Sequence, residues 1–271
     1  MPVNRKLWQR GRSLGFVLFF VFLLFPNPSR ANQSSHSRWA LGLGSGWISD
    51  YPGAAQGRFR FLPFPVYRGS VFRIDRISGV SGEVFNNSRL DFTWNFIFQF
   101  PTESEDIPVR VGMPDLDWLL SIGPQMKYYI YRHKNHSFFF RFPVRFNTCT
   151  NFSDRTQFCG VVFNPGLRHA MRYRNTGEFT FRFEGLFQSS EYQQYFYEVR
   201  PEYATPTRPT YHARSGFLGF VYGMFHTYPF DGWGINSAIN IYDYSLAVND
   251  ESPLFVHKTN YAFFLAVTID L

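Results

Sequence analysis

The sequence predicts an all-β fold, a closed antiparallel transmembrane β-barrel of about 12 strands with about 10 as the alternative. Three observations carry this prediction: an export signal, the absence of a later apolar run long enough for a membrane helix, and a recurrent alternation of aromatic and polar residues. Aromatic residues make up 21% of the chain, yet the mean hydropathy is −0.22. The two kinds of residue are therefore interleaved along the chain.

The N-terminus has the pattern of a secretory signal peptide. A basic segment is followed by the 12-residue apolar run "LGFVLFFVFLLF" (residues 14–25) and then by "PNPSRA", with small residues at Ser29 and Ala31. The apolar run is too short to span a bilayer core of about 30 Å. We therefore expect cleavage after Ala31, which leaves residues 1–31 as the signal peptide and residues 32–271 as the barrel domain. No cysteine follows the run, so no lipid anchor is indicated.

The net charge of the exported chain gives no support to nucleic-acid binding. Residues 1–31 carry five of the 27 Lys/Arg and none of the 20 Asp/Glu, which leaves 22 basic and 20 acidic residues and a net charge of +2. The pI of about 9.5 is therefore largely a property of the signal peptide. No basic stripe remains for a nucleic acid to contact.

The strongest strand is "SRLDFTWNFIFQF" (residues 88–100), in which apolar residues occupy every second position. Side chains alternate between the two faces of a strand. Within lipid every backbone N–H and C=O must be paired, so a spanning sheet has to close on itself. Such a barrel directs aromatic residues to lipid and charges to its interior. We expect Phe92 and Phe96 to face the bilayer, and Asp91 and Asn95 to face the lumen.

The same alternation recurs in "SFFFRFPVRFN" (137–147), "EFTFRFEGLFQ" (178–188) and the C-terminal "NYAFFLAVTIDL" (260–271). Weaker candidate strands are 39–47, 58–67, 70–77, 80–85, 117–123, 125–132, 160–174, 212–226 and 233–245. The charged residues expected to face the lumen are Arg89, Asp91, Arg141, Arg145, Arg182 and Glu184. In a narrow lumen they would form salt bridges, and in a wide one they would line a pore.

The two cysteines, Cys149 and Cys159, enclose the polar segment "TNFSDRTQF". In an oxidising compartment this spacing predicts a disulfide that closes a short loop, with two unpaired thiols as the alternative. A redox-active site would need C-x-x-C spacing, which this sequence lacks. We expect a structural role for the pair.

Three stretches, in this order, resemble the MipA/OmpV family of MltA-interacting outer-membrane proteins. The first is residues 42–69, with the turn Tyr51-Pro52-Gly53. The second is residues 193–216, where Glu198 replaces the family's usual Gly. The third is residues 249–271, where Glu251 stands in the Asp position and the chain ends in Leu instead of the usual Phe.

The resemblance implies a β-barrel in the outer membrane of a Gram-negative bacterium. It further implies a scaffold or interaction protein in cell-envelope and peptidoglycan maintenance, with murein hydrolase and murein synthase enzymes as partners. A porin-like channel for small solutes is the alternative. The outer-membrane lipid bilayer is the surrounding partner, and we expect a monomer or a weak oligomer.

We expect no catalysis, cofactor or metal. No Gly-x-Ser-x-Gly motif occurs, and the nearest nucleophile–base pair is Ser215 with His212. His133 and His136 have a spacing compatible with a metal site, but they lie in a basic loop without a third ligand. The Tyr51-Pro52-Gly53 turn is expected to be structural, because Pro fixes φ and Gly accepts a positive φ.

Overall fold

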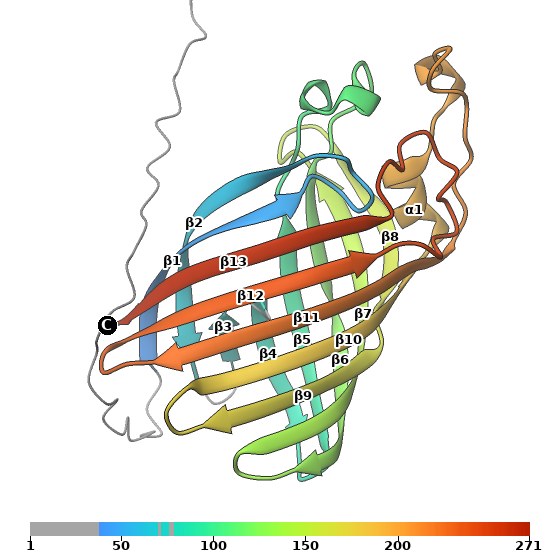
Figure 1. Ribbon diagram of the computed structural model, residues 1–271. Coiled ribbons are helices and arrows are strands. Elements are labelled where there is room, and N and C mark those ends of the chain that lie inside the picture. The colour runs from blue at the N-terminus through green and yellow to red at the C-terminus, as the bar shows by residue number, and fades with distance from the viewer. Residues whose placement is uncertain (1–37, 70–71, 76–78) are drawn as a thin grey trace, which may run out of the picture.

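The computed structural model describes residues 38–69, 72–75 and 79–271, so the predicted signal peptide lies outside the described residues. The chain forms one closed antiparallel barrel (Figure 1). The strands are β1 (Arg38–Ser49), β2 (Gly57–Arg68), β3 (Phe72–Asp75), β4 (Gly79–Asn86), β5 (Leu90–Gln99), β6 (Trp118–Arg132), β7 (His136–Thr150), β8 (Thr156–Phe163), β9 (Gly166–Tyr173), β10 (Gly177–Gln188), β11 (Gly216–Pro229), β12 (Trp233–Asp243) and β13 (Thr259–Asp270). The helices are α1 (Ser190–Tyr197) and the short 3-10 turns Ser104–Asp106, Pro108–Arg110 and Pro201–Tyr203.

The described residues form a 12-strand barrel, as predicted. β8 and β9 both pair with β7 and with β10, and only Asn164 and Pro165 separate them, so they are two parts of one barrel strand. Pairing of β1 with β13 closes the barrel. Two of the weaker candidate strands, 117–123 and 125–132, merge into β6.

One predicted boundary is wrong. The candidate strand 212–226 is displaced, because β11 begins only at Gly216. The preceding segment turns at Thr205–Arg208 around two prolines, Pro206 and Pro209. Proline removes a backbone donor that a strand ladder needs.

The alternation of the strands places aromatic residues outside and polar residues inside. On β5, Trp94 and Phe98 are 45% and 44% exposed, whereas Asp91 and Asn95 are 7% and 2% exposed. The outward residues of β13, from Tyr261 to Ile269, are likewise exposed. Residues 88–100 therefore have the expected orientation, and an exposed apolar surface of this kind is suited to lipid.

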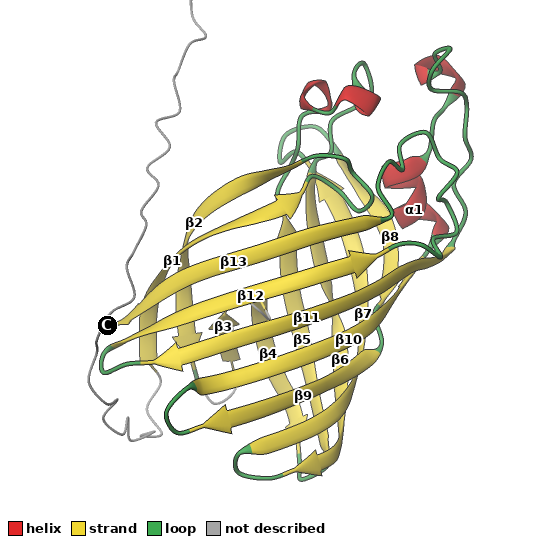
Figure 2. Ribbon diagram, in the orientation of Figure 1, coloured by secondary structure: helices red, strands yellow, loops and turns green. Residues whose placement is uncertain are grey.

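The two ends of the barrel differ in their connections. Four long loops and one short one lie at one end: L1 (50–56), L2 (100–117), L4 (189–215) and L5 (244–258) are long, and L3 (151–155) is short. Tight turns and both ends of the barrel chain lie at the other, where the Leu271 N–H donates to the Trp39 carbonyl. Outer-membrane barrels have short periplasmic turns and longer extracellular loops, which makes the looped end extracellular. Figure 2 shows the helices gathered there.

No helix among the described residues is both long and apolar enough to cross a membrane. Aromatic side chains cluster outside the barrel near both of its ends. At the extracellular end Phe98 and Phe100 pack with Trp118, and at the periplasmic end Phe230 stacks on Trp233 at 3.9 Å. Rings at both membrane–water interfaces are typical of membrane barrels.

The extracellular part of β2 has no described strand on one of its sides. β2 pairs with β1 along its length but with β3 only at Tyr67 and Arg68. The Gly69 N–H donates to the Phe72 carbonyl of β3. The backbone N–H and C=O groups of odd-numbered positions of β2 therefore point away from β1 and toward the side of β3. Pro63 and Pro65 therefore stand at the open edge, where a strand tolerates the loss of an N–H donor.

Beside this unpaired part of β2, side-chain contacts take the place of backbone pairing and connect β2 to L2. Arg58 forms an ion pair with Asp106 of L2 at 3.0 Å. Arg60 donates to the Pro101 carbonyl at 3.1 Å and lies 5.2 Å from the centre of the Phe100 ring. L2 is thereby held against the free edge of β2.

Glycines on β1 make room for two rings inside the lumen. A Cβ at Gly42 would lie 2.3 Å from the Phe64 ring, and a Cβ at Gly44 would lie 2.2 Å from the Phe264 ring. The Gly-rich first strand thus has a packing role, because the tips of two aromatic rings pack against its backbone.

Candidate functional site: a plugged barrel lumen

The extracellular mouth of the barrel is filled by its own loops. L1, L4 with α1, and L5 contribute half of the 18 side chains in the buried apolar cluster at this end of the barrel, and L2 and the adjoining strand ends contribute the rest. This plug comprises Tyr51, Ala54, Ile107, Leu116, Leu119, Cys149, Cys159, Val162, Leu186, Tyr192, Phe196, Tyr197, Ala213, Leu218, Val221, Tyr244, Ala247 and Phe255. The hydrophobic core of the protein therefore lies at one end of the barrel, where it occludes the passage.

The predicted turn Tyr51-Pro52-Gly53 lies at the centre of the plug. Tyr51 is 1% exposed, and its hydroxyl donates to the Leu254 carbonyl at 2.6 Å. The Tyr197 hydroxyl donates to the Pro52 carbonyl at 2.9 Å. Gly53 has a φ of 79°, which favours glycine. The turn therefore joins L1 to L4 and L5.

Two buried asparagines complete these connections. Asn260 on β13 accepts a hydrogen bond from the Gly53 N–H at 2.8 Å and donates to the Ala54 carbonyl at 2.9 Å. Asn249 in L5 donates to Gln193 of α1 at 3.0 Å and to the Arg214 carbonyl at 2.8 Å. Buried polar groups are costly unless they are paired, so these bonds fix the loops in one arrangement.

Two arginines attach L2 to the plug. Arg110 is 3% exposed, donates to the Phe196 carbonyl at 3.2 Å and lies 5.9 Å from the centre of the Tyr51 ring. Arg208 donates to the carbonyls of Val109 and Val111 at 2.9 and 3.0 Å. Burial lowers the pKa of Arg110 from its ordinary value.

Helix α1 lies against β8 at the mouth. Gly160 of β8 has a φ of 88°, and a Cβ there would lie 2.6 Å from the Tyr192 nitrogen, so only glycine allows this approach. Burial raises the pKa of Tyr192 to about 12. Burial also raises the pKa values of Tyr51 and Tyr197. These phenols are therefore neutral at physiological pH.

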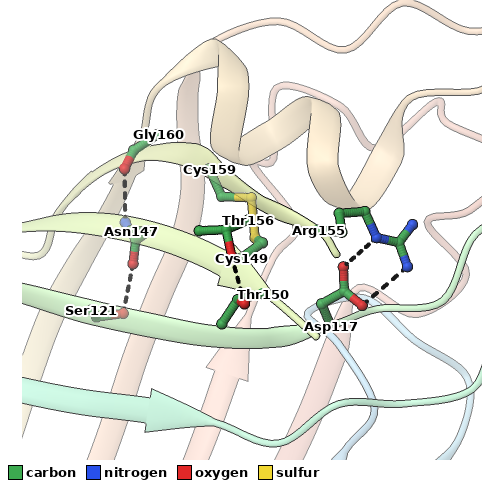
Figure 3. Close-up of a disulfide and its surroundings, with 9 residues drawn as sticks. All are labelled: Asp117, Ser121, Asn147, Cys149, Thr150, Arg155, Thr156, Cys159 and Gly160. Carbon is green, nitrogen blue, oxygen red and sulfur yellow. Dashed lines mark hydrogen bonds and ion pairs between the residues drawn. A yellow bond between two sulfur atoms is a disulfide. The ribbon is translucent and has the colours of Figure 1, made fainter. Parts of the chain in front are cut away.

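The predicted disulfide partners lie beneath α1. Cys149 at the end of β7 and Cys159 on β8 are joined in a disulfide and are 0% and 2% exposed (Figure 3). Asn147, two residues before Cys149 on β7, donates to the Gly160 carbonyl at 3.1 Å and accepts a hydrogen bond from the Ser121 hydroxyl at 2.6 Å. The disulfide closes the base of L3 next to the plug.

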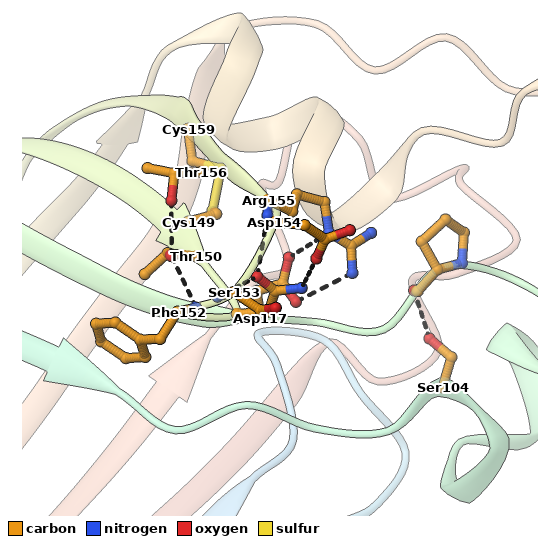
Figure 4. A network of polar contacts seen from close by, with 12 residues as sticks. Ser104, Asp117, Cys149, Thr150, Phe152, Ser153, Asp154, Arg155, Thr156 and Cys159 are labelled. Atoms are coloured by element: carbon orange, nitrogen blue, oxygen red, sulfur yellow. Dashed lines mark hydrogen bonds and ion pairs between the residues drawn. A yellow bond between two sulfur atoms is a disulfide. The ribbon is translucent and has the colours of Figure 1, made fainter.

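A polar network holds L3 in place (Figure 4). Arg155 forms an ion pair with Asp117 at 3.1 Å, and the Thr150 and Thr156 hydroxyls are hydrogen-bonded at 2.8 Å. Phe152 has a positive φ of 59°, and its N–H donates to Thr150 at 3.0 Å. L3 is therefore a tight turn bound to the wall, and it does not fold into the lumen.

Below the plug, the middle of the lumen is crossed by charged side chains. Of the predicted lumen residues, Asp91, Arg141, Arg145, Arg182 and Glu184 lie inside the barrel. The structure adds Lys127, which contacts Asp91 at 2.8 Å, and Arg168, which contacts Glu184 at 2.9 Å. These two residues lie on inward positions of β6 and β9, where the weaker alternation hid them in the sequence.

Arg89 departs from the expectation that it faces the lumen. β5 begins at Leu90, and Arg89 lies exposed in the periplasmic turn. The Arg89 and Leu90 N–H groups donate to the Asn87 side chain at 2.8 and 2.7 Å. Asn87 thus caps a turn that includes Arg89, and the strand alternation begins only at Leu90.

The residues considered for catalysis and metal binding are not assembled into sites. His212 is exposed in L4 and contacts Glu198 at 3.1 Å, while Ser215 lies exposed in the same loop. His133 and His136 lie at a periplasmic turn. Among the described residues, no three His, Cys, Asp or Glu side chains are grouped to hold a metal ion.

A cavity of about 330 Å³ lies on the periplasmic side of the arginines. Its lining includes Arg168, Thr180, Phe225, Thr227, Asn236 and Thr268. Asn236 accepts a hydrogen bond from Thr227 at 3.1 Å and donates to Thr268 at 3.4 Å. The lumen is therefore apolar and closed at the extracellular mouth, and polar toward the periplasm.

These features define an outer-membrane β-barrel whose extracellular mouth is plugged by its own loops. The family model for the MltA-interacting protein MipA matches residues 41–270. The chain belongs to this family. No curated protein matches the sequence.

Solved outer-membrane proteins share the general architecture at very low sequence identity. The NanC porin is 9% identical with a TM-score of 0.41, and the match covers 85% of this chain and 100% of NanC. A bacterial polysaccharide outer-membrane secretin is 9% identical with a TM-score of 0.40, covering 88% and 99%. A Pseudomonas aeruginosa FadL homologue is 8% identical with a TM-score of 0.39, covering 86% and 90%. We draw no functional argument from these similarities.

Proposed function

We propose that this protein is a non-conducting outer-membrane scaffold in peptidoglycan maintenance, which holds a murein hydrolase at its periplasmic face. The observation that carries the proposal is the plug, because Tyr51, Phe196 and Tyr197 are at most 1% exposed across the extracellular mouth. A porin needs a continuous aqueous path. The family description, an MltA-interacting protein, indicates the class of partner.

The charge of the periplasmic rim supports the same proposal. Arg89, Arg132, Lys134 and Arg174 are all exposed in or beside the periplasmic turns, whereas Asp231 is the exposed acidic residue of these turns, so the described rim has an excess of positive charge. A surface of one sign attracts partners of the opposite sign and raises their rate of association. The rim is therefore suited to an acidic surface of a periplasmic enzyme or to anionic peptidoglycan.

The first arm of the test measures conductance in planar bilayers. We expect the purified protein to be silent, whereas a variant in which residues 190–213 are replaced by a short Gly/Ser linker should conduct, because α1 and its flanking loop have been removed. Circular dichroism of both proteins checks that the barrel is retained. A steady open-state current from the unmodified protein would contradict the proposal and favour a porin-like channel.

The second arm measures binding of a purified MltA-type murein hydrolase to the protein in detergent. The double variant Lys134→Gln/Arg174→Gln should bind more weakly, and the difference should shrink as salt is raised. The matched control is Arg200→Gln/Arg214→Gln, which removes two exposed charges from L4 and should bind like the parent. Equal loss in both variants, or no binding by the parent, would sink the proposed docking face.

A further inference from the structure

Four arginines surround a single carboxylate in the middle of the lumen. Glu184 on β10 contacts Arg141 at 3.0 Å, Arg168 at 2.9 Å and Arg182 at 3.7 Å. The fourth, Arg145, lies on the same face of β7 as Arg141 and is within electrostatic reach of Glu184 and Arg168. The three partners of Glu184 come from three different strands, so the barrel wall itself converges cations on one point.

Gly166 makes this convergence possible. It lies in register between Arg141 on β7 and Glu184 on β10. A Cβ at Gly166 would lie 2.5 Å from Cγ of Glu184, so the glutamate side chain passes directly over this position. Glu184 thereby crosses one whole strand to reach Arg141.

Arg145 has no carboxylate within ion-pair distance among the described residues, and its Nε has no hydrogen-bond partner. The residue is 7% exposed. A buried charge is costly unless it is paired and hydrogen-bonded. Lys127 provides no compensation, because it is a cation that is already matched by Asp91 at 2.8 Å.

The charges of the cluster do not balance. Arg141, Arg145, Arg168 and Arg182 supply four positive charges against the one negative charge of Glu184, which leaves an excess of three. Guanidinium groups are suited to planar, bidentate recognition of phosphate and carboxylate. The arrangement therefore matches a site that is completed by an anion.

The cavity adjoins this cluster on its periplasmic side. Arg168 belongs both to the cluster and to the lining of the cavity. The guanidinium carbons of Arg168 and Arg182 lie 5.7 and 5.2 Å from the centre of the Phe225 ring, which also lines the cavity. The remaining lining combines hydroxyl and amide groups with the apolar side chains of Phe64, Val66 and Phe264 and the carboxylate of Glu178. Such a mixture suits the neutral, hydroxylated part of a sugar, which presents both hydroxyl groups and C–H faces.

We propose that this arginine cluster binds the phosphate or carboxylate group of a small hydroxylated molecule, such as a sugar phosphate or sugar acid, that enters from the periplasmic side. Arg145 and the Nε of Arg182 offer free donors to the anion, and Arg168 lies at the entrance. The site is separate from the proposed docking of a murein hydrolase at the rim and is tested independently of it.

The test is isothermal titration calorimetry of the detergent-solubilised protein with glucose 6-phosphate, glucuronate, inorganic phosphate and neutral glucose. We expect the sugar anions to bind and glucose not to bind. Arg145→Gln should weaken binding roughly tenfold to hundredfold, as expected for the loss of a charge-assisted hydrogen bond. The matched control Arg214→Gln, which removes an exposed arginine of L4 outside the cavity, should retain the affinity of the parent.

Thermal melting distinguishes a binding role for Arg145 from a structural one. In anion-free buffer Arg145→Gln should melt at the same temperature as the parent or higher, because it removes an unpaired buried cation. Glucose 6-phosphate should raise the melting temperature of the parent more than that of the variant. Equal binding of glucose, no binding of any anion, or undiminished binding by Arg145→Gln would overturn the proposal. Comparison of the sugar anions with inorganic phosphate then decides whether the hydroxylated part contributes.

Discussion

Single glycines decide which side chains can meet inside this barrel. Gly166 lets Glu184 cross β9, and Gly160 lets α1 approach β8. Gly42 and Gly44 receive the rings of Phe64 and Phe264. In each case the absence of a Cβ provides space that a neighbouring element fills, so these positions are as important to packing as the large residues that cover them.

Gly166→Ala should destabilise the barrel by about 1–3 kcal/mol, the usual cost of overpacking. The added Cβ would lie 2.3 Å from the Phe183 carbonyl oxygen and 2.7 Å from Cα of Glu184, and both atoms belong to the backbone. The measurement is urea unfolding in lipid vesicles. Gly82→Ala is the matched control, because a Cβ at Gly82 meets nothing within 4 Å. Equal stability of the two variants would contradict this account of Gly166.

At the scale of elements, α1 and the loops around it form the part of the molecule most sensitive to alkaline pH. The Tyr192 phenol stays neutral because burial raises its pKa from 10.0 to about 12. A phenol whose pKa is higher in the folded than in the unfolded protein contributes its full stability at a pH below the unfolded-state pKa. This contribution is lost as the pH rises toward the folded-state pKa. The plug should therefore loosen between about pH 10 and pH 12.

Tyr192→Phe should reduce the loss of folding stability at alkaline pH. The reduction should be about 2–3 kcal/mol, the free energy that corresponds to a pKa shift of this size. The measurement is the thermal melting temperature from pH 9 to about pH 12. Tyr261→Phe, on the outer face of β13, removes a hydroxyl that lies outside the plug and serves as the control. A variant at Tyr192 with the same alkaline profile as the parent would show that this phenol does not titrate with unfolding.

The second feature at this scale is the free edge of β2, where backbone groups have no neighbouring strand among the described residues to pair with. An unpaired strand edge exposes donors and acceptors that can pair with another chain. Pro63 and Pro65 remove two donors from this edge, and Arg58 and Arg60 attach L2 beside it. Pro63 and Pro65 thus protect the gap in the described strand pairing beside β2 from pairing with another chain.

At the scale of the whole molecule, the two faces of each strand meet different solvents. Ile239 on β12 is outward and 53% exposed, whereas Asn236 on the same strand lines the periplasmic cavity. Ile239→Lys should cost about 2–4 kcal/mol when the charge lies near the middle of the bilayer. Asn236→Lys should cost much less, because the cavity is polar.

Refolding into lipid vesicles, followed by denaturant titration, compares these two variants directly. The comparison holds the strand and the introduced side chain constant, so only the face changes. If Ile239→Lys were as stable as Asn236→Lys, the outer surface of the barrel would not be in hydrocarbon, and the membrane-spanning arrangement would be refuted.

Much of the architecture could be predicted from local sequence. A period of two in β5, β7, β10 and β13 specifies which residues point outward, because successive side chains of a strand alternate by geometry. Counting such segments bounded the number of strands, and the even number that is usual in bacterial barrels favoured 12. Arg89 fell outside this rule because it belongs to the turn capped by Asn87, so the alternation begins one residue later, at Leu90. This is a local hydrogen-bond effect that strand periodicity does not show.

The plug and the arginine cluster could not be predicted in the same way. Tyr51 reaches Leu254, and Arg110 reaches Phe196, so each contact joins segments far apart in the chain. Arg168 and Lys127 lie on strands whose alternation is weak. No local pattern indicates which loop enters the mouth or how many cations converge on one carboxylate.

The sequence by itself determined the class of molecule, since alternating faces, backbone pairing in lipid and the signal-like N-terminus leave few other folds. Only the tertiary structure decided that the mouth is filled, that three arginines share Glu184 and that Arg145 lies beside them. The physical reason is that a strand's face depends on its immediate neighbours in the chain. The contents of the lumen depend on barrel closure, which brings side chains from distant strands and loops into one small space.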